Sequence, residues 1–308
     1  MNVHFEKWHG CKNDFIVIWA SVSQYKNLGP SLVRQSVQLC DRHSGVGADG
    51  IIILIHSNTQ ERPDTAVILN SDGSLAQTCG NGIRCAALSV YTRSLEKIKT
   101  PLEFLELKVE NLTYTCQFLP QKGSLPLVQV NMGVAKLDEQ NSWHKKALDF
   151  VGKKLNEKNL SILASNVHTV SLANQHLVFL LEEELDLALM RDLGRLLQNS
   201  SEWDGINVSF VSELKQNVSS FPLAMQSLET SEAYKVFIWE RGAGETQACG
   251  SAACAIGVSL LSPGWISREA WVPMFFPGGY LFAKQNSQDE EVLLSGPGKF
   301  VFSGDFSL

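Results

Sequence analysis

Apolar runs separated by polar turns follow one another along the whole chain, and their spacing predicts many strands and few helices. The runs with strand-like length and β-branched content cover residues 3–5, 15–19, 65–70, 104–118 (with a break near Asn111) and 127–132. Longer runs with helical spacing cover residues 31–42, 83–91, 185–198 and 252–261. We expect Ser31 to be the N-cap of the first helix, and we expect mostly local, antiparallel strand connections. The pattern indicates an α+β chain that is rich in strands.

Two of the predicted helices, 83–91 and 252–261, are very apolar, and the same residues precede both. The shared pattern is Gln-x-Cys-Gly, which occurs as Gln77-x-Cys79-Gly80 and again as Gln247-x-Cys249-Gly250. An apolar strand precedes each cysteine, and Asn70 and Glu240 stand at the same distance from their cysteines. The order of turn, strand, helix, strand and cysteine is therefore repeated in the two halves of the chain, which indicates a duplicated unit.

A chain of 308 residues with 44% hydrophobic residues can form two domains with cores of their own. The duplication predicts two pseudo-symmetric domains, residues 1–131 and 132–296, each built around one apolar helix. The polar segment 138–159, weakly helical at 143–155, is expected to be a surface connection between the halves.

Charge and hydropathy exclude several classes of protein. The net charge of −6 gives no positive surface for nucleic acid. No apolar run approaches the ~18 residues of a membrane span, and the N-terminal residues lack the apolar core of a signal peptide. We expect a cytoplasmic protein without nucleic-acid or membrane partners.

The seven cysteines are expected to be reduced thiols, because their number is odd and no signal peptide is recognised. The spacing from Cys79 to Cys85 and from Cys249 to Cys254 does not match a zinc site, so no metal is expected. Segment 45–50 matches G-x-G-x-x-G, but a predicted helix precedes it and a β-branched run follows, which is the reverse of a dinucleotide-binding unit. No cofactor is predicted.

Cys79 and Cys249 are the candidate reactive groups, because each is expected at the N-terminus of a helix. There the helix dipole lowers the pKa of a thiol and attracts a carboxylate. One acid/base group on each face of an α-carbon is what racemisation or epimerisation of an amino acid requires. A single cysteine at a helix start would more simply be a small core residue, but the repeated context of these two favours a function.

The sequence resembles the diaminopimelate epimerases over nearly its whole length. The resemblance lies in His9-Gly10-x-x-Asn13-Asp14-Phe15, in Cys40-Asp41-Arg42-His43-x-Gly45-Val46-Gly47-Ala48-Asp49-Gly50, in Asn70-Ser71-Asp72-Gly73-Ser74 through Cys85, in Glu240-Arg241-Gly242-x-Gly244-Glu245-Thr246-x-Ala248-Cys249-Gly250-Ser251 and in Phe276-Pro277-Gly278-Gly279. It implies a barrel-like shell around each central helix, an active site in the cleft between the domains, and a return of residues 297–308 to the first domain.

The same resemblance implies roles for individual residues. Cys79 and Cys249 would be the base and the acid, without pyridoxal phosphate or metal. The groups that would hold the reacting carboxylate are Gly80, Asn81, Gly250 and Ser251. Those that would bind the ends of the substrate are Asn13, Asn70, Asn174, Asn207, Glu240 and Arg241. His176 and Glu240 are candidate proton relays.

The implied reaction is the interconversion of LL- and meso-diaminopimelate in lysine and peptidoglycan precursor synthesis, and the resemblance also allows a homodimer. Three positions depart from the usual family pattern: Lys12 and Ala252 replace glycines, and Gln175 replaces a proline. These changes leave two alternatives open, a racemase or epimerase of another amino acid on the same fold and a non-catalytic amino-acid-binding paralogue.

Overall fold

The computed structural model divides the chain into two compact units. Unit 1 comprises Met1–Asn131 and Ser295–Leu308, and unit 2 comprises Met132–Leu294. The structure describes residues 2–57, 62–76, 79–137, 142–157, 166–172, 174–198, 205–214, 232–286 and 290–308. Among the helices of these residues, none combines the length and the hydrophobicity of a transmembrane segment.

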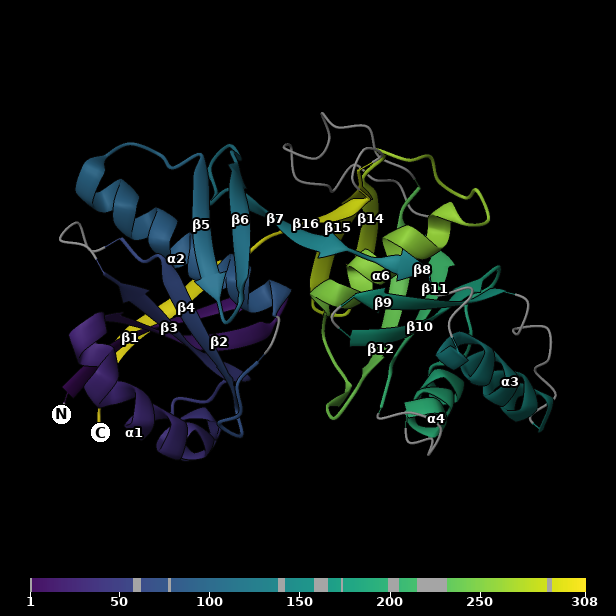
Figure 1. The fold of residues 1–308 in the computed structure, drawn as a ribbon, viewed down its shortest axis with the longest axis horizontal. Coiled ribbons are helices and arrows are strands. Elements are labelled where there is room, and N and C mark those ends of the chain that lie inside the picture. Colours follow the sequence, from purple (N-terminus) through teal and green to yellow (C-terminus); the bar gives the residue numbers. More distant parts are fainter. Residues whose placement is uncertain are drawn as a thin grey trace. The chain divides into compact units, whose positions relative to one another are not determined.

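Both units mix helices with a larger number of strands (Figure 1), which confirms the predicted α+β class. The elements of unit 1 are β1 (Asn2–Gly10), β2 (Asn13–Ser21), α1 (Val22–Cys40), β3 (Gly50–His56), β4 (Thr65–Asn70), α2 (Gly80–Ile98), β5 (Phe104–Val109), β6 (Leu112–Leu119), β7 (Leu127–Val134) and β17 (Lys299–Ser307). The C-terminal strand β17 pairs antiparallel with β1 along its whole length.

Not all strand pairs of unit 1 are local and antiparallel. β2 and β3 are parallel, as are β4 and β5, and in each case a helix makes the crossover. β3 and β4 pair antiparallel between them, and β5, β6 and β7 follow as a meander. The helices α1 and α2 supply the long connections that parallel strand pairs require.

The prediction for α1 was wrong at its start. The helix begins at Val22, nine residues before Ser31, and its N-cap is Ser21. Ser21 Oγ accepts from the backbone N–H of Gln24, and the Gln24 side chain bonds back to the Ser21 N–H, which forms a capping box. Pro30 lies inside the helix at an exposed position, so the missing hydrogen bond is tolerated there.

The apolar helix α2 lies at the centre of unit 1. It is buried without a break from Gly80 to Val90, and its exposed last turns end at Lys99, which has a left-handed conformation. The predicted helix at 83–91 is thus the buried middle of a longer helix.

Unit 2 repeats the order of unit 1. Its elements are β8 (Lys136–Leu137), α3 (Ser142–Glu157), β9 (Val167–Leu172), β10 (Asn174–Leu181), α4 (Leu187–Gln198), β11 (Asn207–Glu213), β12 (Tyr234–Glu240), β13 (Gly244–Glu245), α6 (Gly250–Leu261), β14 (Val272–Phe276), β15 (Gly279–Gln285) and the first four residues of β16 (Glu291–Gly296). β10 and β11 are parallel across α4, and β12 and β14 are parallel across α6, just as β2 with β3 and β4 with β5 are in unit 1.

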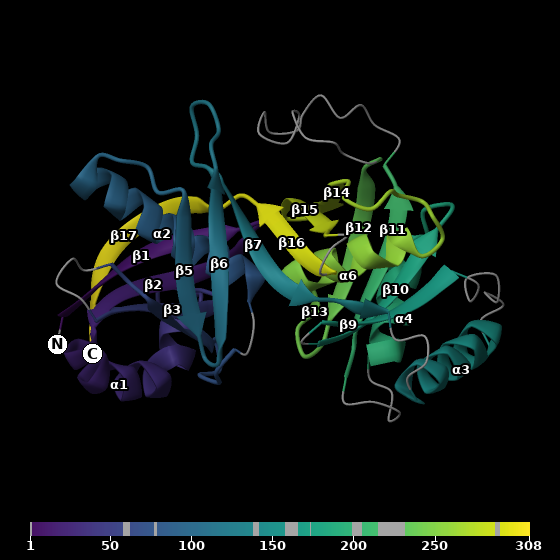
Figure 2. The ribbon, with the colours of Figure 1, turned by 45° about the horizontal axis from the view of Figure 1, so that its top comes forward.

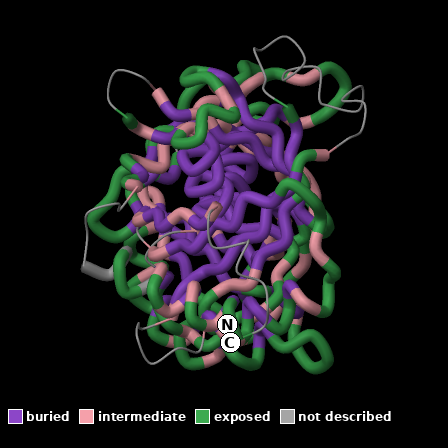
Figure 3. Tube along the Cα trace, turned by 90° about the vertical axis from the view of Figure 1, so that its right-hand side faces the viewer, coloured by how far each residue is buried: buried purple, intermediate pink, exposed green. Residues whose placement is uncertain are grey.

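Helix α6 is buried over eleven successive residues, from Gly250 to Leu260, and it contacts β9, β10, β11 and β15 (Figure 2). The other face of these strands carries a second apolar layer with α3 and α4. Figure 3 shows the buried segments gathered in the interior, with exposed loops and helix faces outside.

Helix α3 corrects the expectation that segment 138–159 only connects the halves. Val151 and Leu155 on this helix are fully buried and belong to the core of unit 2. Residues 138–141 and 158–159 of the segment lie outside the described part of the chain.

Candidate functional site

Cys79 stands at the N-cap of α2, as the sequence predicted. Its Sγ accepts a hydrogen bond from the Gly82 N–H at 3.3 Å, and its carbonyl accepts from the Ile83 N–H at 2.9 Å. The thiol therefore replaces the usual hydroxyl or carboxylate cap at the positive end of a helix. Its side chain is half-buried. Gln77 and Thr78, which precede it, lie outside the described residues.

Two of the predicted amides are directly connected in unit 1. Asn81 is buried in the first turn of α2, and its Nδ2 donates to Oδ1 of Asn13 at 3.2 Å. Asn13 Nδ2 donates in turn to Oδ2 of Asp49 at 2.8 Å, and Arg84 Nη2 donates to Oδ1 of Asn81 at 2.7 Å. The chain of donors thus runs from Arg84 to Asp49 through both amides.

An ionic cluster supports the Asp49 end of this chain. Asp14 forms ion pairs with Lys7 at 2.8 Å and with Arg42 at 2.7 Å, and Arg42 also reaches Asp49 at 2.7 Å. These cations hold the pKa of Asp14 well below its usual range although burial opposes them. The cluster fixes the starts of β2 and β3 against each other.

Asn70 is the last residue of β4, and it lies at the sheet edge where β2 and β3 begin. In the strand register Phe15 is paired with Gly50, and Gly50 with Asn70. The Asn70 side chain donates to Ser74 Oγ at 2.9 Å within the turn that follows the strand. Asn70 thus lies beside the start of β3 and bonds within its own turn.

Cys249 stands at the N-cap of α6, and its side chain is only 7% exposed. It makes no capping hydrogen bond, and its sulfur lies 3.4 Å from Ser251 Oγ. Burial and the charge of Glu240 raise the pKa of Cys249 well above its usual value, although Ser251 and the Ala252 N–H pull the other way. The expectation of a lowered pKa was wrong for this cysteine, because desolvation and the charge of Glu240 outweigh the hydrogen bonds from Ser251 and Ala252.

Arg241 is the centre of a polar group at the edge of β10, β11 and β12. Its backbone N–H donates to Asn207 Oδ1 at 3.0 Å, and its Nη2 donates to Asn174 Oδ1 at 3.1 Å. Asn207 Nδ2 reaches the Gln175 carbonyl at 3.4 Å. Three predicted substrate-binding residues are thus held together by their own hydrogen bonds.

Glu240 is half-buried and connects this group with Cys249. Its Oε1 accepts a hydrogen bond from Thr246 Oγ1, and its negative charge is one of the causes of the raised pKa of Cys249. A carboxylate beside a protonated thiol can accept the proton when the thiol gives it up.

His176 is fully buried on β10, opposite Asn207 in the parallel register. Among the described residues, neither ring nitrogen has a hydrogen-bond partner. Burial and the nearby charge of Arg241 lower the pKa of His176 to about 3, so the ring is neutral at ordinary pH. A buried neutral imidazole with unused nitrogens is unusual and costs stability unless a ligand or water uses them.

The two half-sites lie at corresponding places in the order of elements. Asn70 ends β4 as Glu240 ends β12, and Cys79 and Cys249 each begin the next helix. The reasoning from the sequence missed the residues that support these groups. Arg84 and Asp49 hold the amides of unit 1, and Thr246 holds Glu240. All three residues lie inside the motifs that carry the family resemblance, and this was the only sign in the sequence that they support the site.

Gly205 is another supporting residue that the reasoning from the sequence missed, because it makes room for Arg241. It has a φ of 78°, and a Cβ there would lie 2.7 Å from Cγ and Cδ of Arg241. The glycine therefore leaves room for the aliphatic part of the arginine side chain.

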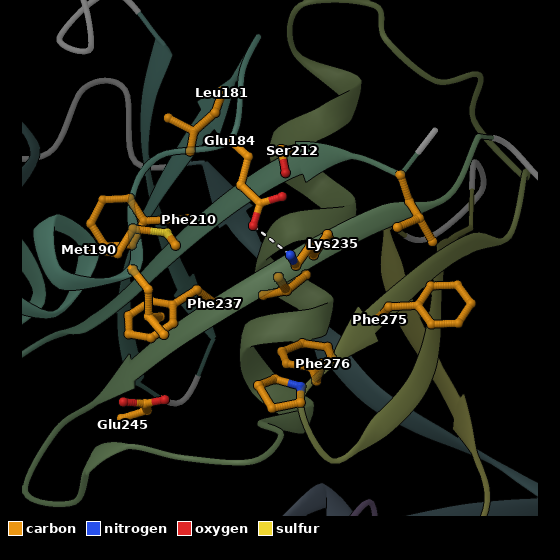
Figure 4. Close-up of a pocket in the computed structure, with 14 residues that line it drawn as sticks. Leu181, Glu184, Met190, Phe210, Ser212, Lys235, Phe237, Glu245, Phe275 and Phe276 are labelled. Carbon is orange, nitrogen blue, oxygen red and sulfur yellow. Dashed lines mark hydrogen bonds and ion pairs between the residues drawn. The ribbon is translucent and has the colours of Figure 1, made fainter. Parts of the chain in front are cut away.

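A cavity of about 490 Å³ lies elsewhere in unit 2, beside the start of α4 (Figure 4). Its walls are mostly apolar, with Met190, Phe210 and Phe237 on one side and Phe275 and Phe276 on the other. Lys235 and Glu184 form an ion pair there. None of the predicted site residues lines this cavity, so the candidate site is elsewhere.

Comparison with known proteins gives a consistent family. The profile described as diaminopimelate epimerase matches residues 5–137. A protein of Pelotomaculum thermopropionicum named diaminopimelate epimerase is 32% identical over 308 residues, which cover 99% of each chain. One of Synechocystis with the same name is 33% identical over 309 residues, again 99% of each chain.

Solved structures share the fold at low sequence identity. A PhzF-family phenazine biosynthesis protein of Bacillus anthracis matches with a TM-score of 0.63 at 10% identity, over 100% of both chains. A hydroxyproline epimerase of Agrobacterium vitis with bound trans-4-hydroxy-L-proline matches with a TM-score of 0.60 at 12% identity, over 99% of this chain and 92% of that one. With relatives of 32–33% identity along its whole length, this chain belongs to the diaminopimelate epimerase family.

Proposed function

We propose that this protein is a diaminopimelate epimerase, an isomerase that interconverts LL- and meso-diaminopimelate by proton transfer between two thiols and the α-carbon. The observation that carries the proposal is the placement of Cys79 and Cys249 at the N-caps of corresponding helices in a chain of this family. A two-base mechanism requires both thiols to reach one carbon from opposite faces. It would serve lysine and peptidoglycan precursor synthesis.

The helix starts suit the reacting carboxylate. Each presents backbone N–H groups, at Gly80 and Asn81 in α2 and at Gly250 and Ser251 in α6. Donors of this kind stabilise the negative charge that develops on the carboxylate when the α-proton leaves. We propose that these four residues bind that carboxylate, and that neither metal nor pyridoxal phosphate takes part.

The far end of diaminopimelate carries an ammonium and a carboxylate. Arg241 offers a guanidinium, and Asn174 and Asn207 hold it in place. A guanidinium can bind a carboxylate with two hydrogen bonds, and amides can bind either group. We propose that these three residues bind the far end, with Asn13 and Asn70 contributing from unit 1.

The protonation state of Cys249 supports different roles for the two cysteines. The raised pKa of Cys249 makes it the thiol of the pair, so it would donate a proton to the carbanion. Glu240 would then take part in returning a proton to or from Cys249, and the neutral ring of His176 is the second candidate relay.

The test is turnover of LL-diaminopimelate in deuterated water, followed by NMR and chiral separation. We expect meso product that carries deuterium at the α-carbon from the first turnover. Cys79→Ala and Cys249→Ala should each abolish epimerisation and keep the circular dichroism of the wild type. An active single variant would contradict the paired assignment.

A panel of other amino acids, including proline and hydroxyproline, separates the alternatives. Turnover of one of them without turnover of diaminopimelate would identify a different racemase or epimerase. Binding without any exchange of the α-proton would identify a non-catalytic paralogue.

We further propose a cytoplasmic homodimer. The support is a stretch of exposed apolar side chains on β17, where Phe300, Val301 and Phe302 are 42%, 50% and 44% exposed. Apolar patches of this kind are common at protein interfaces. Light scattering after size exclusion should give twice the mass of one chain, and Val301→Asp should give the monomer.

A further inference from the structure

Arg84 is a fully buried cation in the first turns of α2. Its side chain is 0% exposed, and among the ion pairs of the described residues none involves it. The guanidinium bonds instead to three uncharged oxygens, the Gly80 carbonyl at 3.1 Å, Asn81 Oδ1 at 2.7 Å and the Pro297 carbonyl at 3.5 Å, and it also forms a hydrogen bond with the buried Cys11 thiol. A buried charge without a counter-ion is costly and is kept where it has a task.

Two of the three oxygens that Arg84 reaches belong to the start of the helix that carries Cys79. Gly80 follows Cys79 directly, and Asn81 follows Gly80. Gly10 makes room for the guanidinium, since a Cβ at this position would lie 3.1 Å from Arg84 Nη2. The β1–β2 hairpin and the β17 side of unit 1 therefore close around the arginine.

Arg84 also determines which way the Asn81 amide is turned. A guanidinium can only donate, so the Asn81 oxygen must face it and the Asn81 –NH₂ group must face Asn13. Asp49 can only accept, so the Asn13 –NH₂ group must face Asp49. The Arg84 cation at one end and the Asp49 carboxylate at the other thus fix the orientation of both amide side chains.

The duplicated half-site has no cation at the equivalent helix position, and its arginine, Arg241, lies directly after β12 instead. Arg84 lies five residues after Cys79, and the residue five after Cys249 is the buried Cys254. Conversely, the position of Glu240 in unit 2 is occupied by the neutral Asn70 in unit 1. At these two positions the Cys79 half-site is the more positive one, and a positive charge near a thiol favours the thiolate.

We propose that Arg84 is a positioning residue of the Cys79 half-site: it fixes the Asn81 and Asn13 amides as donors toward the substrate and supplies the positive charge that favours the Cys79 thiolate. The kinetic part of this inference rests on the proposed function, whereas the part on the thiol does not. The Asn81 and Asn13 amides would donate hydrogen bonds to the substrate carboxylate, and the Cys79 thiolate would remove the α-proton.

The first test measures Cys79 without any substrate. The rate of alkylation by iodoacetamide is followed against pH by mass spectrometry of the peptide that carries Cys79, with the fully buried Cys116 as an internal control for unfolding. We expect Arg84→Met to move the midpoint up by about 0.5–1 pH unit, whereas Arg84→Lys, which keeps the charge, retains the midpoint of the wild type. An unchanged midpoint in folded Arg84→Met overturns the electrostatic part.

The second test measures turnover of LL-diaminopimelate by the same variants and by Asp49→Ala. Arg84→Lys cannot reproduce the fork of hydrogen bonds, so we expect its KM to rise about tenfold. Asp49 is exposed and its removal frees the far end of the amide chain, so a smaller rise in KM is expected. A wild-type KM in both variants overturns the positioning role.

The two tests also separate this inference from the proposed function. If Arg84→Met fails to fold, which labelling of Cys116 reveals, Arg84→Lys and Asp49→Ala still decide the positioning role. If the wild type does not turn over diaminopimelate, the proposed function fails, and the pH profile of Cys79 in a folded Arg84→Met variant still decides the electrostatic role.

Discussion

At the scale of single residues, the two thiols differ although their sequence contexts are repeated. Cys79 accepts a hydrogen bond from the Gly82 N–H, whereas Cys249 makes no capping bond. Position 82 is a glycine, and its counterpart in α6 is Ala252. A Cβ at position 82 would lie 3.1 Å from Cys79 Sγ, so the cap of Cys79 requires a residue without a side chain there.

Gly82→Ala tests this requirement. The new Cβ would lie 3.1 Å from Cys79 Sγ and 3.5 Å from Ile52 Cδ1, so the thiol must move. We expect kcat for the proposed epimerisation to fall about 10- to 100-fold, because a small displacement of a reacting group is costly. Gly152→Ala on α3 is the matched control, since its Cβ meets nothing within 4 Å. Equal kcat in Gly82→Ala and wild type would contradict the cap.

Lys12 is a second residue whose conformation matters. Cys11 and Lys12 form the two-residue turn between β1 and β2, with φ values of 51° and 66°. A left-handed conformation disfavours a side chain with Cβ, and glycine adopts it freely. The glycine usual at position 12 in the family thus has a physical reason.

We expect Lys12→Gly to raise the free energy of unfolding by about 0.5–1 kcal/mol, measured by denaturant titration. Lys12→Ala removes the same charge and keeps the Cβ, so it should give no gain. A stabilisation of equal size in both variants would mean that the charge, not the backbone, is responsible.

At the scale of elements, one strand was predicted with its observed bounds, others were predicted too short, and the start of the first helix was wrong. β4 was predicted with its observed bounds, because an apolar run between polar turns defines it. The start of α1 was not, because a capping box at Ser21 competes with the Pro30–Ser31 pair, and local propensity does not decide between them. The cysteines at both helix starts were predicted from the apolar runs that follow the repeated Gln-x-Cys-Gly pattern.

Strand β10 carries a buried histidine, which predicts acid sensitivity. The pKa of His176 is near 3 in the folded chain and 6.5 in the unfolded one, so below pH 6.5 only the unfolded chain takes up the proton. Stability is therefore lost as the pH falls. We expect this group to lower the free energy of unfolding by about 2 kcal/mol between pH 7 and pH 5.

The measurement is a denaturant titration at both pH values, with His176→Gln as the control. Other groups, such as His9, contribute to both proteins alike, so the difference between their pH slopes isolates His176. A slope in His176→Gln as steep as in the wild type would contradict the assignment.

At the scale of the whole molecule, the sequence was most informative where it repeats. The duplication predicted the order of elements in both units and the cysteine at the start of each central helix. It could not predict the supporting residues, because Arg84, Asp49 and Thr246 act through contacts with residues distant in the sequence or specific to one half. Nor could it predict the pKa of Cys249, which depends on how completely the folded chain buries the sulfur.

The two-base proposal makes one prediction about both units together. If Cys79 and Cys249 approach one carbon, mild oxidation should join them in a disulfide and inactivate the enzyme, and a reducing agent should restore activity. Peptide mapping by mass spectrometry identifies the pair, and bound substrate should protect it. A disulfide between other cysteines, or inactivation without any disulfide, counts against the proposal.

The pairing of β1 with β17 bears on how the chain is made. Asn2 is the partner of Ser307 in this pairing, so β1 cannot form its hydrogen bonds with β17 until residue 307 has been made. During synthesis the segment 132–294 emerges complete and can fold while unit 1 still lacks a strand. The half with Cys79 is thus finished only after residues 299–307 have been made, and a chain that ends before them would carry one formed thiol site and one unformed one.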